Sequence, residues 1–160
     1  MKLNQLKVSG KHPKWCGPSA LSIITGRTVN YCAKLIADRK NHYGWRRGRG
    51  TSKQVKGTSN SEMRDALDVM GFELIPVEIP RHRLNRQVLG KGHTMPTLHR
   101  YMRERGGDQW KGLMLVNVTS HYVVVHKDTV SDNHQQDKHY TEHRWRRKKI
   151  DRAWLISRLR

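Results

Sequence analysis

The stretch Trp15-Cys16-Gly17-Pro18-Ser19-Ala20-Leu21 decides the expected fold of the first part of this chain. It predicts a helix over 16–25, because Pro18 is tolerated in a first helical turn, where its missing N–H has no partner to lose. The apolar face of this helix consists of Ala20, Leu21, Ile23 and Ile24. A cysteine therefore lies at the helix N-terminus, where the negative charge of a thiolate is favoured.

After residue 25, the hydrophobic pattern of the sequence changes along the chain from one typical of helices to one typical of strands. Further helices are expected at about 28–38, at 59–70 and from Thr94 or Thr97 to Gly106. Strands are expected at 72–79, 112–118, 121–126, 129–132 and 152–157. Helices followed by an antiparallel meander indicate an α+β fold, with N-terminal helices packed on a C-terminal antiparallel sheet.

Length and composition predict one domain over residues 1–160, with basic loops at about 39–57, 81–93 and 133–149. The chain has two cysteines, Cys16 and Cys32, which make a weak disulfide framework. Neither a signal peptide nor a segment long enough to cross a bilayer is recognisable. These features predict a reduced, cytoplasmic protein without a membrane span.

His121 begins a β-branched run, His121-Tyr122-Val123-Val124-Val125, after a tight turn. An imidazole at a strand start can meet a thiol at a helix start in the fold, take its proton and later return it to a leaving group. Asp132 ends the following strand, so an antiparallel hairpin brings it beside His121 to orient the ring. Asn133 and Asp128 are alternative orienting residues.

Each of these features also has a purely structural interpretation. A Cys-Gly-Pro sequence at a helix start can be a buried turn, and the chain has ten histidines. Taken together, in the order cysteine-helix, sheet-histidine, strand-aspartate, they favour a catalytic site. No metal site or cofactor is predicted, because His126, His134, His139 and His143 lack a ligand spacing that fits zinc.

Charge is the other strong signal. Thirty-two Lys and Arg against thirteen Asp and Glu give a net charge of +19, which attracts polyanions such as nucleic acid. Two basic tracts with an interleaved tryptophan are candidate nucleic-acid-binding segments: Trp45, Arg46, Arg47 and Arg49 in the first, and Arg144, Trp145, Arg146 and Arg147 in the second. Solvated loops that bind nothing in particular are an equally good interpretation.

The residues quoted around Cys16, His121 and Asp132 resemble the papain-like cysteine peptidases over residues 14–133. The pattern is most similar to the bacteriocin-processing (double-glycine leader) peptidase domains, and it is also similar to small papain-like proteins of tailed bacteriophages. The resemblance implies a papain-like fold with Cys16 as nucleophile, His121 as general base and Asp132 as orienting group. It implies a protein or peptide substrate, and a viral protein in the host cytoplasm or the virion.

The first hypothesis is therefore a cysteine-dependent hydrolase, a peptidase or isopeptidase that acts through a thioester. The family usually has an oxyanion-hole glutamine several residues before the cysteine, whereas residues 8–14 contain none and Gln5 lies further upstream. Lys11, His12 and Lys14 are the nearest alternative donors. The second hypothesis is a catalytically inactive papain-like fold that serves as a nucleic-acid-associated or virion structural protein.

Overall fold

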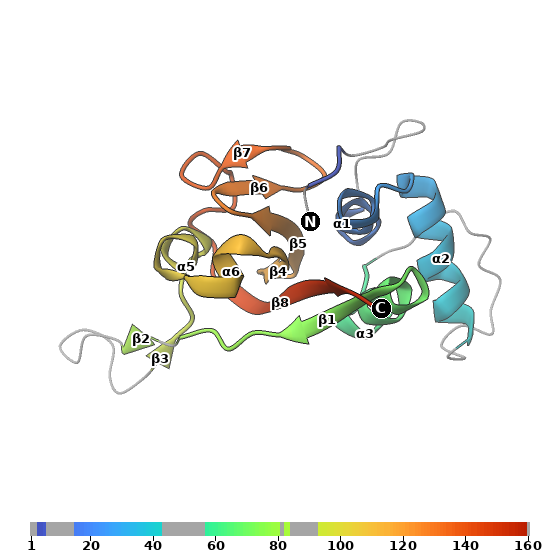
Figure 1. The fold of residues 1–160 in the computed structure, drawn as a ribbon, viewed down its shortest axis with the longest axis horizontal. Helices are drawn as coiled ribbons and strands as arrows, with labels where there is room; N and C mark the ends of the chain where they lie inside the picture. Colours follow the sequence, from blue (N-terminus) through green and yellow to red (C-terminus); the bar gives the residue numbers. More distant parts are fainter. Residues whose placement is uncertain (1–2, 6–14, 43–56, 81, 84–92, 160) are drawn as a thin grey trace.

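The computed structural model describes residues 3–5, 15–42, 57–80, 82–83 and 93–159 (Figure 1). Most of the basic segments at 39–57 and 81–93 lies outside this part. In the described residues, helices come first and an antiparallel sheet follows, so the predicted α+β fold is confirmed.

The described residues of the N-terminal half form three helices: α1 (Cys16–Thr25), α2 (Val29–His42) and α3 (Asn60–Val69). α1 ends at Gly26, whose φ of 74° is the left-handed conformation that glycine adopts without strain. α3 begins with the predicted capping box, in which Ser59 and Glu62 each accept a backbone N–H of the other. α2 continues beyond the expected end at residue 38, because residues 39–43 contain no glycine or proline that would end the helix.

The main sheet has the strand order β1-β8-β4-β5-β6-β7, and every neighbouring pair is antiparallel. Its strands are β1 (Phe72–Pro76), β4 (Leu113–Val118), β5 (His121–His126), β6 (Thr129–Ser131), β7 (Lys138–His139) and β8 (Ile150–Arg158). The last strand, β8, lies between β1 and β4. β1 is therefore an edge strand, which is where its proline is tolerated.

The two remaining expected loops contain short regular elements. β2 (His82–Arg83) pairs with β3 (His93–Thr94) within the segment that was predicted as a loop at 81–93. The segment 133–149 contributes β7 and a series of turns that pack on the sheet. Between α5 (Leu98–Glu104) and β4 the chain adds a short helix, α6 (Gly107–Lys111), at a position where only a helix end was expected.

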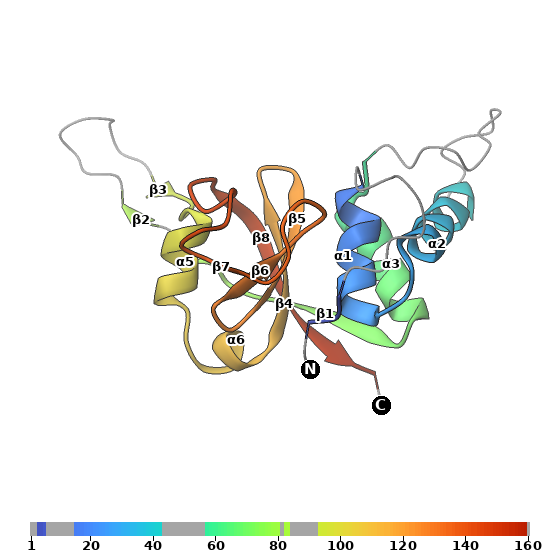
Figure 2. The ribbon, with the colours of Figure 1, turned by 90° about the horizontal axis from the view of Figure 1, so that it is seen from above.

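Both faces of the sheet are covered. Side chains alternate along β4, β5 and β8, so Leu115, Tyr122 and Trp154 pack with α1, α2 and α3, while Met114, Val123 and Ala153 pack with α5. Figure 2 shows α1, α2 and α3 on one side of the sheet and α5 on the other. β4 and β5 therefore read as continuous apolar runs, as expected for strands that are buried on two faces.

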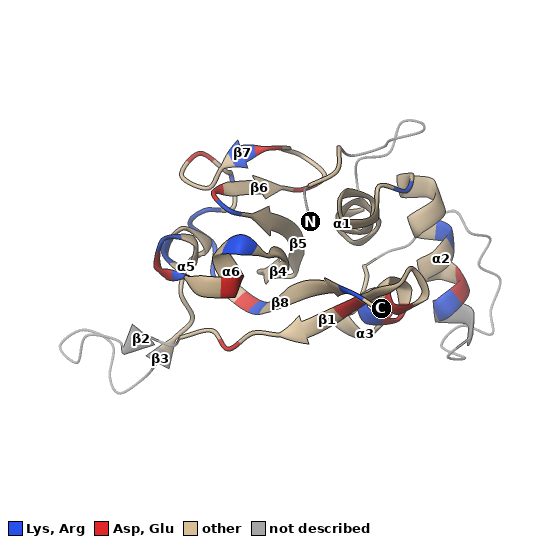
Figure 3. Ribbon diagram, in the orientation of Figure 1, with Lys and Arg blue, Asp and Glu red and all other residues tan. Residues whose placement is uncertain are grey.

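The charged residues do not gather on one element. Lys and Arg of the described part occur on the helices of both halves and on the sheet (Figure 3). Among the helices that the structure describes, none combines the length and apolar character needed to span a bilayer.

Candidate active site

Cys16 and His121 meet where α1 packs against β5. Cys16 is the first residue of α1, and its half-buried sulfur is hydrogen-bonded by the His121 ring and by the backbone N–H of Tyr122. His121 is the buried first residue of β5. The turn before it, Thr119-Ser120, has positive φ at both residues and reverses the chain between β4 and β5. Helix start and strand start therefore bring the thiol and imidazole into contact.

Asp132 completes the group. Its Oδ2 lies 2.8 Å from Nε2 of His121, and the carboxylate is almost fully buried at 1% exposure. Since Nε2 faces Asp132, Nδ1 is the ring nitrogen that remains for Cys16. The structure thus brings together the three residues that the sequence singled out, with Asp132 rather than Asn133 or Asp128 on the histidine.

The Asp132 carboxylate is held by several donors. Backbone N–H groups of His134 and Gln135 donate to Oδ1 at 2.8 and 2.7 Å. The indole Nε1–H of Trp145 donates to Oδ2 at 2.9 Å, and Nε2 of the fully buried His143 lies 3.7 Å from Oδ1. This carboxylate is therefore both fixed in position and kept ionised, as an orienting group must be.

The three ionisable groups shift one another toward their charged forms. Burial alone raises the pKa of Cys16, but hydrogen bonds from His121 and the backbone of Tyr122, with the charge of His121, outweigh it, so this pKa lies below its usual value. Burial lowers the pKa of His121, yet hydrogen bonds with Asp132 and Cys16 raise it to about 9. Burial also opposes ionisation of Asp132, but the hydrogen bonds from His121 and from the backbone N–H groups of Gln135 and His134, with His143 3.7 Å away, hold its pKa well below the usual range.

These directions favour a thiolate–imidazolium pair near neutral pH. Cys32 shows the opposite behaviour, because burial raises the pKa of its thiol to about 11. The pKa values of the two thiols are therefore shifted in opposite directions, and Cys32 serves as an internal reference for Cys16.

Trp145 is a site residue that the sequence did not reveal. Its indole stacks on the His121 ring with centroids 4.4 Å apart and planes 20° apart, and it donates to Asp132. The guanidinium of Arg144 lies 5.6 Å from the centroid of the same indole. His121 covers one face of the indole, and the contact of Trp145 with nucleic acid stays a prediction. A tryptophan in a basic loop has no spacing that would have indicated the contact with His121.

The other predicted nucleic-acid residues fall into two groups. Trp45, Arg46, Arg47 and Arg49 lie outside the described residues. In the second tract, Arg144 and Arg147 are exposed, whereas Arg146 is half-buried and donates to the carbonyl of His143 at 3.4 Å. The exposed arginines stay candidate polyanion contacts.

The surroundings of the sulfur leave backbone N–H groups as candidate oxyanion donors. The side-chain amide of Gln5 donates to Asp137 at 2.9 Å. Lys11, His12 and Lys14 lie outside the described residues. The first N–H groups of a helix have no intrahelical carbonyl partner. In α1, Pro18 has no N–H and that of Gly17 hydrogen-bonds the Cys16 sulfur, so the N–H of Cys16 is the candidate oxyanion donor.

Gly17 allows a close approach beside the sulfur. A Cβ at this position would lie 2.4 Å from Oγ1 of Thr58, in the segment that leads into α3. Glycine is therefore required for α1 to pack against this segment.

No group of three or more His, Cys, Asp or Glu side chains is arranged to hold a metal ion in the part of the chain that the structure describes. Comparisons with family models, curated proteins and solved structures return no match for this chain.

Proposed function

We propose that this chain is a cysteine-dependent hydrolase with a papain-like fold, acting on a peptide or isopeptide bond. The observation that carries the proposal is the contact series from Cys16 at a helix N-terminus, through His121, to the buried Asp132. The papain-like fold is supported by the order of elements, in which a cysteine-initiated helix precedes an antiparallel sheet with the histidine and aspartate on one hairpin.

The reaction follows from the charges of these groups. The Cys16 thiolate attacks the substrate carbonyl carbon, and the carbonyl oxygen becomes an oxyanion that the backbone N–H of Cys16 at the start of α1 stabilises. His121 gives its Nδ1 proton to the leaving amine, so the C–N bond breaks and a thioester remains. His121 then takes a proton from water, whose oxygen attacks the thioester, releases the acid and restores the thiolate.

The test is the reaction of Cys16 with iodoacetamide, followed by mass spectrometry of the labelled peptides. We expect Cys16 to react at pH 7 at least tenfold faster than a free model thiol, because its lowered pKa raises the thiolate fraction. Cys32 in the same molecule is the slow reference.

Replacement of His121 separates an activated pair from a merely accessible thiol. His121→Ala removes the hydrogen bond and the positive charge while Cys16 stays half-buried, so labelling at pH 7 should fall below that of the model thiol. A Cys16 that reacts no faster than the model thiol, or equally fast in the variant, contradicts the proposal.

A second candidate function is the binding of nucleic acid. It is supported by the net charge of +19 and by four exposed basic residues, Arg144, Arg147, Lys148 and Lys149. It is compatible with the first, since basic segments can recruit a hydrolase to an acidic target.

A further inference from the structure

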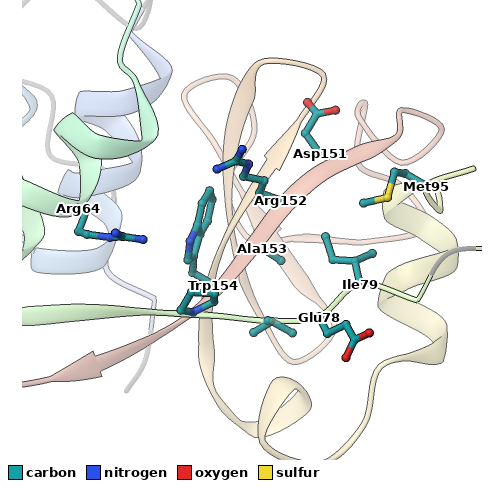
Figure 4. Close-up of a pocket in the computed structure, with 10 residues that line it drawn as sticks. Arg64, Glu78, Ile79, Met95, Asp151, Arg152, Ala153 and Trp154 are labelled. Atoms are coloured by element: carbon teal, nitrogen blue, oxygen red, sulfur yellow. The ribbon is translucent and has the colours of Figure 1, made fainter.

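An open pocket of about 790 Å³ extends from Arg64 of α3 across the start of β8, at residues 151–154, to the segment 76–79 at the end of β1 and to Met95 before α5. Val77, Ile79 and Ala153 provide apolar lining, and Trp154 contributes its indole. Arg64 of α3 and Arg152 of β8 also line it, and Figure 4 shows both side chains directed toward Trp154 from these two elements. We call this space the arginine subsite.

The two arginines have no carboxylate partner among the residues that the structure describes. Two acidic residues, Glu78 and Asp151, also line the cavity, but Figure 4 shows their carboxylates directed away from the arginines. Oδ2 of Asp151 accepts the backbone N–H of Ser120 at 3.1 Å. Two guanidinium groups beside an aromatic ring, with apolar walls, make an environment suited to a carboxylate on a short aliphatic stem.

The sheet connects this subsite to Cys16. Tyr122, Asn117 and Arg152 are directly opposite one another on the adjacent strands β5, β4 and β8, and they share one face of the sheet. Tyr122 donates its backbone N–H to the Cys16 sulfur, and its phenol lies within electrostatic range of both Cys16 and Arg152. Two strand spacings are about 10 Å, which an extended peptide covers in about three residues.

α3, which carries Arg64, is also connected to Cys16 through Tyr122. The hydroxyl of Tyr122 donates to Oδ1 of Asn60 at 2.6 Å, and Asn60 begins α3. Arg64 follows four residues later, so the two side chains lie on one face of the helix, one turn apart. Both arginines therefore face the same space from opposite walls, and both walls meet at Tyr122 next to the sulfur.

The direction of a bound substrate follows from the roles of the catalytic groups. A leaving amine must approach His121, whose other ring nitrogen faces Asp132 at the end of β6. The acyl part of the substrate then extends the other way, across β4 and β8, toward the arginine subsite.

We propose that the arginine subsite binds the side-chain carboxylate of an acidic residue on the acyl side of a peptide substrate, about three residues from the cleaved bond. This proposal rests on the proposed function and adds to it a substrate class, namely peptides with an acidic residue at one fixed position. Arg64 and Arg152 are its specificity-determining residues.

The experiment measures binding without chemistry, in the full-length Cys16→Ser protein. The probes are acetylated, amidated alanine pentapeptides that carry one Glu at successive positions, each with a matched Gln peptide. Affinity is read from the NMR resonance of the Trp154 indole N–H, which is assigned with Trp154→Phe. We expect a Glu peptide to bind about tenfold more tightly than its Gln counterpart at one position, as charge-assisted hydrogen bonds predict.

Variants distinguish the subsite from the general field of a chain with a net charge of +19. Arg64→Gln with Arg152→Gln should reduce the preference for Glu to less than about twofold, since its charge-assisted donors are gone. Arg103→Gln with Lys138→Gln changes the net charge equally on exposed residues of α5 and β7 and should leave the preference intact. Equal affinity for Glu and Gln peptides, or a preference that survives in the first double variant, overturns the proposal.

The carboxylate that the arginines bind could also be the C-terminus of a peptide, and a Gln peptide with a free C-terminal carboxylate tests this alternative. If this peptide binds as tightly as the Glu peptide, the assignment to a side chain is overturned. Iodoacetamide labelling of Cys16 in the otherwise unmodified protein reports on the hydrolase separately. Rapid labelling without a Glu preference refutes the subsite alone, whereas a Glu preference without rapid labelling refutes the hydrolase and leaves an acidic-peptide binding site.

Discussion

At the scale of single residues, the site depends on how Asp132, His121 and Cys16 shift one another's charges. Asp132 is ionised because five groups donate to it or face it, and it stabilises positive charge on His121. His121 in turn stabilises negative charge on the sulfur. Removal of any member should therefore change the titration of the others.

The pH dependence of Cys16 alkylation and of hydrolysis should differ. Alkylation needs only the thiolate, so its rate should fall on the acid side alone, below the usual thiol range, because the pKa of Cys16 is lowered. Hydrolysis also needs protonated His121, so it should fall again above pH 9, where His121 loses its proton. In His121→Asn the alkylation midpoint should move upward. A midpoint that is unchanged in this variant would show that His121 does not influence the thiol.

Trp145 is expected to be a positioning residue rather than a nucleic-acid contact. Trp145→Phe keeps a ring against His121 but removes the donor to Asp132, and Trp145→Ala removes both. We expect the iodoacetamide rate of Cys16 at pH 7 to fall about tenfold in Trp145→Ala and less in Trp145→Phe, as one lost hydrogen bond to a charged group predicts. Polyanion affinity should be the same in both variants, and a selective loss of that affinity would contradict the assignment.

At the scale of elements, the site requires α1 to approach the segment before α3 closely. Gly17→Ala places a Cβ 2.4 Å from Oγ1 and 2.6 Å from Cβ of Thr58. We expect the free energy of unfolding in urea to fall by about 1–3 kcal/mol, the usual cost of overpacking. Gly106→Ala is the matched control, because a Cβ there has no heavy atom within 4 Å.

Thr58→Gly tests the cause of this loss. It removes both atoms that the new Cβ would meet, so combining it with Gly17→Ala should cost less than the sum of the two single changes. If the losses of unfolding free energy in the two single variants add up to the loss in the double variant, contact with Thr58 is not the cause of the Gly17→Ala effect.

At the scale of the whole molecule, the net charge of +19 predicts binding to polyanions in general. Affinity for a single-stranded oligonucleotide should fall by about a hundredfold or more between 50 and 200 mM salt if several phosphates are contacted. Fluorescence anisotropy with a labelled oligonucleotide measures it. No binding at 50 mM salt would remove the second candidate function while leaving the hydrolase proposal unaffected.

The α+β class and most helix and strand positions followed from the sequence, because periodicity and capping are local. The capping box at Ser59 and the apolar runs of β4 and β5 are examples. Errors occurred where local signals were weak, as in β7, α6 and the last turn of α2. These short elements are stabilised by packing against the rest of the chain, which local sequence patterns do not show.

The sequence alone also identified Cys16, His121 and Asp132, since a thiol at a helix start and an imidazole at a strand start are recognisable from their neighbours. Only the tertiary structure decided that Trp145 covers His121 and that Arg64 and Arg152 line one cavity. The contacts of these residues join segments far apart in the chain. No local pattern encodes such contacts, because they depend on which face of each element is turned toward the other.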